Sequence, residues 1–162
     1  MSQTPWWKGK HGEWYVVTQF LLFALVIFGP RKFSGWPTWS SPYYGLGFIV
    51  GSVLVLAGGL LLLTAAFKLS TNITPLPYPK EQATLVETGP YRLVRHPMYS
   101  GGIFAAFGYA LLVHGWLTIG YAVILFVFFD IKSRREERWL KERFSDYIAY
   151  KKRVHKLIPF VY

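Results

Sequence analysis

The stretch YYGLGFIVGSVLVLAGGLLLLTAAF, Tyr43–Phe67, decides the fold class, because it runs for twenty-five residues without a charged side chain. An α-helix needs about 20 apolar residues to cross the hydrocarbon of a bilayer. The stretch therefore predicts a membrane-spanning helix. Glycines within it at 47, 51, 58 and 59 predict a small-residue surface for close packing against another helix.

Three further apolar blocks predict additional spans. The block 13–28 runs into Gly29-Pro30-Arg31-Lys32 and not into a small-residue cleavage site, so it is expected to be retained as a span. The blocks 97–113 and 116–131 are shorter and predict a helical hairpin. The sequence thus predicts an all-α integral membrane protein of about four transmembrane helices, in a single domain over residues 1–162.

The positive charges predict how the chain is oriented. The net charge is +10, and sixteen of the eighteen Lys and Arg residues lie in the N-terminal tail, between the second and third spans, or after Phe129. Basic residues beside long apolar blocks are topological signals, so no nucleic-acid partner is expected. The positive-inside rule places both termini and the central loop in the cytoplasm.

The first chemical signal lies where the long loop 69–96 meets the third span. The loop is rich in proline, and loops of this length are usually functional or disordered. Its end, TGPYRLVRHPMYSG at 88–101, offers hydrogen-bonding and aromatic side chains from Tyr91, His96 and Tyr99 at a helix start. Unpaired N–H groups at a helix start favour an anionic ligand group. These residues predict a small-molecule site, although His96 alone would also suit a capping or interfacial histidine.

The second signal lies on the fourth helix, which is expected to run on past Asp130 into an amphipathic, cytoplasmic C-terminal segment, 132–162. Glu136 follows Lys132 by four residues, so the two share one face of that helix. A salt-bridged helix that docks on anionic lipid is the competing interpretation. The chain has no cysteine and no His pair at metal-ligand spacing, so no metal is expected.

The two signals together resemble a known family. The run GPYRLVRHPMYSG, then an apolar hairpin, then EERWLKERFSDYIAYKKRVHKLIPF, is similar to the isoprenylcysteine carboxyl methyltransferase and phospholipid methyltransferase superfamily of membrane enzymes. The resemblance covers about half the chain, residues 72–162. It implies S-adenosyl-L-methionine as the cofactor, bound at the cytoplasmic face, and methyl transfer to a lipophilic acceptor. An isoprenylcysteine-like carboxylate, a lipid amine, and a small thiol or phenol all remain open as the acceptor, and the oligomeric state is undetermined.

The resemblance also implies roles for individual residues. The family's cofactor contacts fall on Ala83, Thr84, Leu85, Val86, Tyr91, His96, Pro97, Met98, Tyr99 and Glu136. Glu136 and Lys132 are the catalytic candidates. The family usually carries an arginine at the position of Lys132, and lysine keeps the charge but loses the bidentate fork of a guanidinium.

Two other classes compete with the methyltransferase. Membrane sterol reductases that use NADPH resemble the superfamily in their C-terminal part. A non-catalytic lipid-binding scaffold would explain the basic C-terminal segment without any cofactor.

Overall fold

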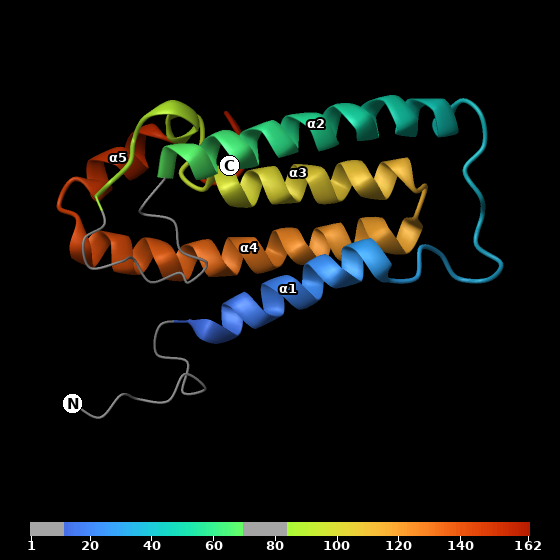
Figure 1. The fold of residues 1–162 in the computed structure, drawn as a ribbon, viewed down its shortest axis with the longest axis horizontal. Helices are drawn as coiled ribbons and strands as arrows, with labels where there is room; N and C mark the ends of the chain where they lie inside the picture. The colour runs from blue at the N-terminus through green and yellow to red at the C-terminus, as the bar shows by residue number, and fades with distance from the viewer. Residues whose placement is uncertain (1–11, 70–83) are drawn as a thin grey trace.

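The computed structural model describes residues 12–69 and 84–162, and all the named secondary-structure elements in these residues are helices (Figure 1). The helices, in chain order, are α1 (Glu13–Phe28), α2 (Tyr43–Leu69), the 3₁₀ turn η3 (Gly89–Arg92), α3 (Pro97–Leu112), α4 (Trp116–Arg143) and α5 (Tyr147–Arg153). The predicted all-α class is confirmed. Half of the predicted loop 69–96, residues 70–83, lies outside the described residues.

The four long helices form an antiparallel arrangement in which α3 lies between α2 and α4, and α1 crosses α4 (Figure 1). Buried apolar side chains from α1, α3, α4 and the C-terminal segment make the core: Val26, Ile103, Ala106, Ala122, Leu125, Phe129 and Leu157. The connections α1–α2 and α3–α4 lie at one end of the bundle, and η3, α5 and the last turns of α4 lie at the other. The second end is called the η3–α5 end below.

Glycines allow α2 and α3 to pack in direct backbone contact. A Cβ atom added to Gly58 would lie 2.6 Å from the carbonyl oxygen of Gly101, and one added to Gly51 would lie 2.7 Å from that of Gly108. Such distances are too short for any side chain, so only glycine fits at these crossings. The predicted packing role is confirmed for Gly51 and Gly58, whereas a Cβ on Gly59 would meet open space.

The C-terminal segment departs from the single amphipathic helix that was expected. As predicted, α4 continues past Asp130, but it ends at Arg143 because Phe144 is extended, with φ −120° and ψ 114°. The chain then forms the short helix α5 and returns without helix from Val154 to the bundle. This return brings the last residues against the start of α3.

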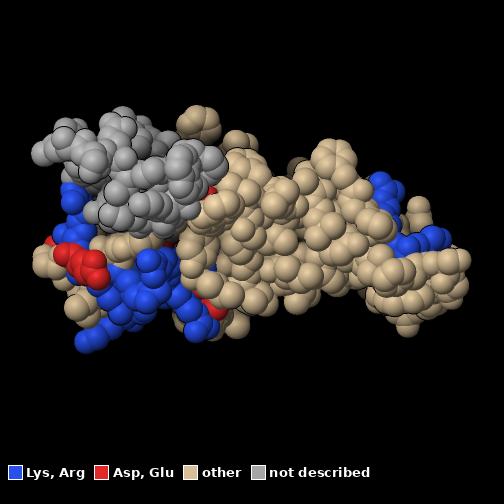
Figure 2. Space-filling view, turned by 90° about the horizontal axis from the view of Figure 1, so that it is seen from below, with Lys and Arg blue, Asp and Glu red and all other residues tan. Residues whose placement is uncertain are grey.

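The described part of the chain contains two helices long and apolar enough to cross a membrane, α2 and α4. The helices α1 and α3 have 16 residues each, which corresponds to about 24 Å at 1.5 Å per residue. Large apolar side chains face outward, and Leu60 of α2 is 65% exposed. Lys and Arg gather at the two ends of the molecule and leave an uncharged belt between them (Figure 2).

Candidate active site

A stack of aromatic rings forms the floor of the candidate site at the η3–α5 end. Pro97 occupies the first turn of α3 and His96 the N-cap position, so His96 and Tyr99 lie one turn apart on the same face. Their rings are parallel within 6°, with centroids 5.4 Å apart. The other neighbour of Tyr99 is Phe129 of α4, stacked at 4.6 Å. The stack fixes the direction in which the Tyr99 hydroxyl points.

Glu136 of α4 receives that hydroxyl. The Tyr99 hydroxyl donates a hydrogen bond of 2.9 Å to Oε2 of Glu136, and Nδ1 of His96 lies 3.5 Å from the same oxygen. The side chain of Glu136 keeps 26% of its surface exposed. It is therefore a carboxylate that is positioned by protein groups and still open to a ligand.

Lys132 lies one turn before Glu136, and both contact Tyr99. The Lys132 ammonium is 5.1 Å from the centroid of the Tyr99 ring, within cation–π range. It donates a hydrogen bond of 2.6 Å to the side-chain oxygen of Gln19 on α1. Lys132 is only 1% exposed, so it is held between helices. The structure thus brings together four of the predicted residues: His96, Tyr99, Lys132 and Glu136.

Glu137 forms an acidic pair with Glu136 in the sequence but was predicted to have no role of its own, yet it is the most heavily paired carboxylate of the cluster. It accepts a hydrogen bond of 2.8 Å from Nε of Arg95 and one of 2.5 Å from Nζ of Lys151. The Nε2 atom of His96 lies 3.4 Å away. Only 4% of the Glu137 side chain is exposed. Glu137 is therefore buried and paired within the protein, whereas its neighbour Glu136 is accessible.

The C-terminal return, residues 154–162, fixes the backbone position of His96. Three donors bond to consecutive carbonyls of residues 155–157: Arg95 N–H to His155 at 2.8 Å, His96 N–H to Lys156 at 3.2 Å, and Ser100 Oγ to Leu157 at 2.6 Å. The Arg95 guanidinium also donates to the carbonyl of Val154. A segment more than fifty residues away in sequence therefore sets the position of the first turn of α3.

Burial shifts the pKa values of His96 and Tyr91 in opposite directions, whereas the charge of Glu136 raises both. Burial lowers the pKa of His96, but hydrogen bonds and charges from Glu136 and Glu137 outweigh it, and the pKa lies above its ordinary value of 6.5. Burial, and then the charge of Glu136, raise the pKa of Tyr91. Tyr91 is accordingly a neutral phenol at physiological pH, and its carbonyl accepts a hydrogen bond of 2.6 Å from Tyr150.

The remaining predicted residues precede the cluster or begin α3. Pro97 is buried and Met98 half-buried in the first turn of α3. Thr84 is exposed, and Leu85 and Val86 are half-buried in the extended segment before η3. Ala83 lies outside the described residues.

The cluster suits a ligand that carries both a cationic and an anionic group. Glu136 is a positioned, accessible acceptor for an ammonium or hydroxyl donor, and no side-chain hydrogen bond caps the N-terminus of α3 beside it. The amino-acid portion of S-adenosyl-L-methionine has both groups, so the residues present fit this cofactor. Among the described residues, no three His, Asp or Glu side chains lie close enough together to hold a metal ion.

The fold and the cluster define a class: an all-helical bundle with an apolar outer belt and a polar site at one end. Comparison with known proteins narrows this class. The sequence profile of the phospholipid methyltransferase family matches residues 46–147, and the chain belongs to that family. The resemblance to the wider methyltransferase superfamily is therefore confirmed.

Individual relatives agree with this assignment. The chain is 30% identical to protein-S-isoprenylcysteine O-methyltransferase B of Arabidopsis thaliana over 142 residues, which are 85% of this chain and 68% of that protein. It is 32% identical to the probable protein-S-isoprenylcysteine O-methyltransferase of Oryza sativa subsp. indica over 117 residues, 69% and 61% of the two chains. It is 28% identical to the cobalt-zinc-cadmium resistance protein CzcN of Cupriavidus metallidurans over 153 residues, 94% and 64%. The chain thus spans about 61% of the length of the rice relative.

Proposed function

We propose that the protein is a single-domain, S-adenosyl-L-methionine-dependent methyltransferase that acts on a lipophilic acceptor at the membrane surface. The family assignment supports methyl transfer. The observation that carries the proposal is the geometry of Glu136, an accessible carboxylate that Tyr99 and His96 hold at the polar end of an apolar bundle. The comparisons do not favour the reductase or the scaffold.

When bound, S-adenosyl-L-methionine would supply a methyl group attached to a positively charged sulfur. An acceptor atom can attack the methyl carbon directly while the thioether leaves, so no covalent enzyme intermediate is needed. The protein then contributes position and electrostatics. Glu136 binds the amino group or a ribose hydroxyl of the cofactor. The N–H groups at the start of α3 bind its carboxylate. Met98 and Tyr91 would complete the walls, together with residues 84–86.

Lys132 occupies a position at which the family usually carries an arginine, but its role differs from that of a bidentate guanidinium clamp. It is buried between Gln19 and Tyr99, so its ammonium acts from beneath the site and not as an exposed clamp. A positive charge there holds the Tyr99 ring and favours an anionic group near Glu136. Lys132 thus remains a catalytic candidate, as an electrostatic and positioning group.

We infer that α1, α2, α3 and α4 all cross the bilayer, with the termini and the site at the cytoplasmic face. The basic ends and the uncharged belt between them support this placement. The acceptor would reach the site from the membrane. An isoprenylcysteine-like carboxylate is the first candidate because two relatives are named for that substrate, with a lipid amine and a small thiol or phenol as the others.

Calorimetric titration of the detergent-purified protein tests the proposal. Wild type should bind S-adenosylmethionine and its demethylated product saturably and should not bind NADPH. Glu136→Ala should lose at least tenfold in affinity for both adenosyl ligands, because a charged hydrogen bond contributes about 1.5–3 kcal/mol. Glu142→Ala, which removes an exposed carboxylate of the same helix, is the matched control. Unchanged affinity in Glu136→Ala would contradict the site, and binding of NADPH alone would replace the methyltransferase with a reductase.

A further inference from the structure

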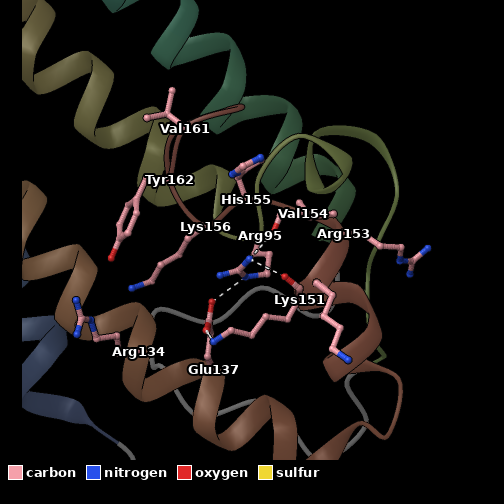
Figure 3. Close-up of a pocket in the computed structure, with 11 residues that line it drawn as sticks. Arg95, Arg134, Glu137, Lys151, Arg153, Val154, His155, Lys156, Val161 and Tyr162 are labelled. Atoms are coloured by element: carbon pink, nitrogen blue, oxygen red, sulfur yellow. Dashed lines mark hydrogen bonds and ion pairs between the residues drawn. The ribbon is translucent and has the colours of Figure 1, made fainter.

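A pocket with a volume of about 540 Å³ (Figure 3) lies next to the candidate active site, because Arg95 and Glu137 line it. It lies between α4, α5 and the C-terminal return. None of the residues predicted to bind the cofactor lines it, and Arg95 and Glu137 form the wall that it shares with the site. It is therefore a neighbouring cavity with its own chemistry.

The lining of this pocket is strongly basic. Six Lys and Arg side chains contribute to it: Arg95, Arg134, Lys151, Lys152, Arg153 and Lys156. Among the described residues that line it, Glu137 contributes the only acidic side chain. In Figure 3 the long basic side chains of Arg95, Lys151 and Lys156 extend across the pocket between the C-terminal return and α4.

The carboxylates around the pocket do not balance these charges. Glu137 is shared by Arg95 and Lys151. Asp130 is shared in the same way by Arg134 and Lys156, and Glu87 pairs with Arg153: the distances are 2.7, 2.5 and 2.9 Å. Among the described residues, six cations thus face three carboxylates, and Lys152 forms no ion pair there. A concave surface with this excess of positive charge favours an anion.

The pocket also has an apolar margin. Phe160 and Val161 of the C-terminal return are 81% and 74% exposed, and Val161 lines the pocket. On α4, Val127 and Ile131 are exposed and share the face of Arg134 by their spacing of three to four residues. A basic pocket that continues into exposed apolar surface suits a molecule with an anionic head and hydrocarbon chains.

We propose that this pocket binds the phosphate headgroup of an anionic phospholipid, whose chains lie against the apolar face of α4. The inference rests on the proposed membrane placement but not on methyl transfer. The bound lipid would set the depth of the η3–α5 end in the membrane surface, and it would fill a cavity that is separate from the cofactor site.

Native mass spectrometry of the detergent-purified protein tests this with three probes: phosphatidylglycerol, phosphatidylcholine and inorganic phosphate. The double variant Arg134→Gln/Lys152→Gln removes two exposed cations of the lining. The double variant Lys141→Gln/Arg143→Gln removes two exposed cations of α4 outside the pocket and has the same net charge. Thermal unfolding of each variant verifies that the fold is retained.

We expect phosphatidylglycerol to bind wild type saturably and more tightly than phosphatidylcholine. One cation near an anionic headgroup contributes about fivefold in affinity, so the pocket variant should lose roughly 25-fold. The control variant should stay within about twofold of wild type. Equal losses in the two variants would overturn the proposal in favour of general surface charge, and displacement of the lipid by inorganic phosphate would overturn it in favour of a soluble anion.

Titration of the same variants with S-adenosylmethionine separates this inference from the proposed function. The pocket variant should bind the cofactor like wild type, because Arg134 and Lys152 lie outside the cofactor site. Loss of cofactor affinity with retained lipid binding would overturn the inference and assign the pocket to the cofactor. Failure of every variant, wild type included, to bind the cofactor would count against the proposed function alone.

Discussion

Two adjacent glutamates illustrate how the surroundings of a residue decide its role. Glu136 and Glu137 have the same chemistry, but helical geometry turns their side chains about 100° apart. Glu137 points toward Arg95 and Lys151 and is fully paired. Glu136 points toward Tyr99 and retains an accessible oxygen surface. Glu137 therefore stabilises the fold, whereas Glu136 is available to a ligand.

This difference predicts that Glu137→Gln mainly loses stability, whereas Glu136→Gln mainly loses affinity for the cofactor. Glu137→Gln leaves two cations of the cluster without their carboxylate, and breaking a buried ion pair costs about 3–5 kcal/mol. We expect a large drop in the midpoint of thermal unfolding for Glu137→Gln. Glu136→Gln should unfold within a few degrees of wild type but bind S-adenosylmethionine weakly. Equal unfolding midpoints for the two variants would contradict the assignment.

His96 predicts a dependence of stability on pH. Its pKa in the folded protein lies above the ordinary value of 6.5 because of Glu136 and Glu137. A raised folded-state pKa gives a stabilising contribution that is complete below the pKa of the unfolded chain and is lost as the pH rises through the folded-state value. The loss of stability in His96→Gln should therefore be largest at about pH 6 and shrink toward about pH 9.

Denaturant unfolding in detergent at several pH values measures this effect. His155→Gln, which removes an exposed histidine, serves as the control for the loss of an imidazole elsewhere at the same end of the molecule. A penalty for His96→Gln that grows with pH would show that the histidine is held in its neutral form.

At the scale of elements, the α2–α3 contact depends on glycine at particular positions. Gly58→Ala would place a methyl group 2.6 Å from a backbone oxygen of α3, so the helices must separate. Gly59→Ala adds the same methyl group to open space. We expect Gly58→Ala to lower the midpoint of thermal unfolding by several degrees, since overpacking costs about 1–3 kcal/mol, and Gly59→Ala to leave it unchanged or raise it. Destabilisation of both variants to the same extent would instead indicate a general effect on helix propensity or lipid contact.

The elements themselves were largely predictable from sequence, whereas the contacts between distant ones were not. The apolar blocks gave the bounds of α1 to within the residue, because an uninterrupted apolar run leaves the chain few alternatives to a helix. The shared face of Lys132 and Glu136 followed from helical spacing. The pairing of Arg95 with Glu137, 42 residues apart, and the return of residues 155–157 to α3 have no local periodicity to reveal them. They depend on the break at Phe144, which was not predicted from the sequence.

At the scale of the whole molecule, the candidate site and the basic pocket lie at the same end of the bundle. Helices of alternating direction place the C-terminal end of α2, the start of α3 and the C-terminal end of α4 together (Figure 1). The C-terminal return then bonds to the start of α3 at Arg95, His96 and Ser100, and its Lys156 pairs with Asp130 of α4. The position of the first turn of α3 consequently depends on residues 155–157, although the family profile stops at residue 147.

The absence of cysteine from the sequence allows a direct test of how the molecule lies in the membrane. Ser34 is exposed in the α1–α2 loop, and Ser145 is exposed between α4 and α5 at the other end. If the helices cross the bilayer with the basic η3–α5 end in the cytoplasm, a membrane-impermeant maleimide should label Ser34→Cys but not Ser145→Cys in intact cells. In inverted vesicles the pattern should reverse, and in detergent both variants should react. Labelling of the two cysteines from the same side would show that the apolar belt does not separate them, and would contradict the membrane placement on which the proposed site and its lipid pocket both depend.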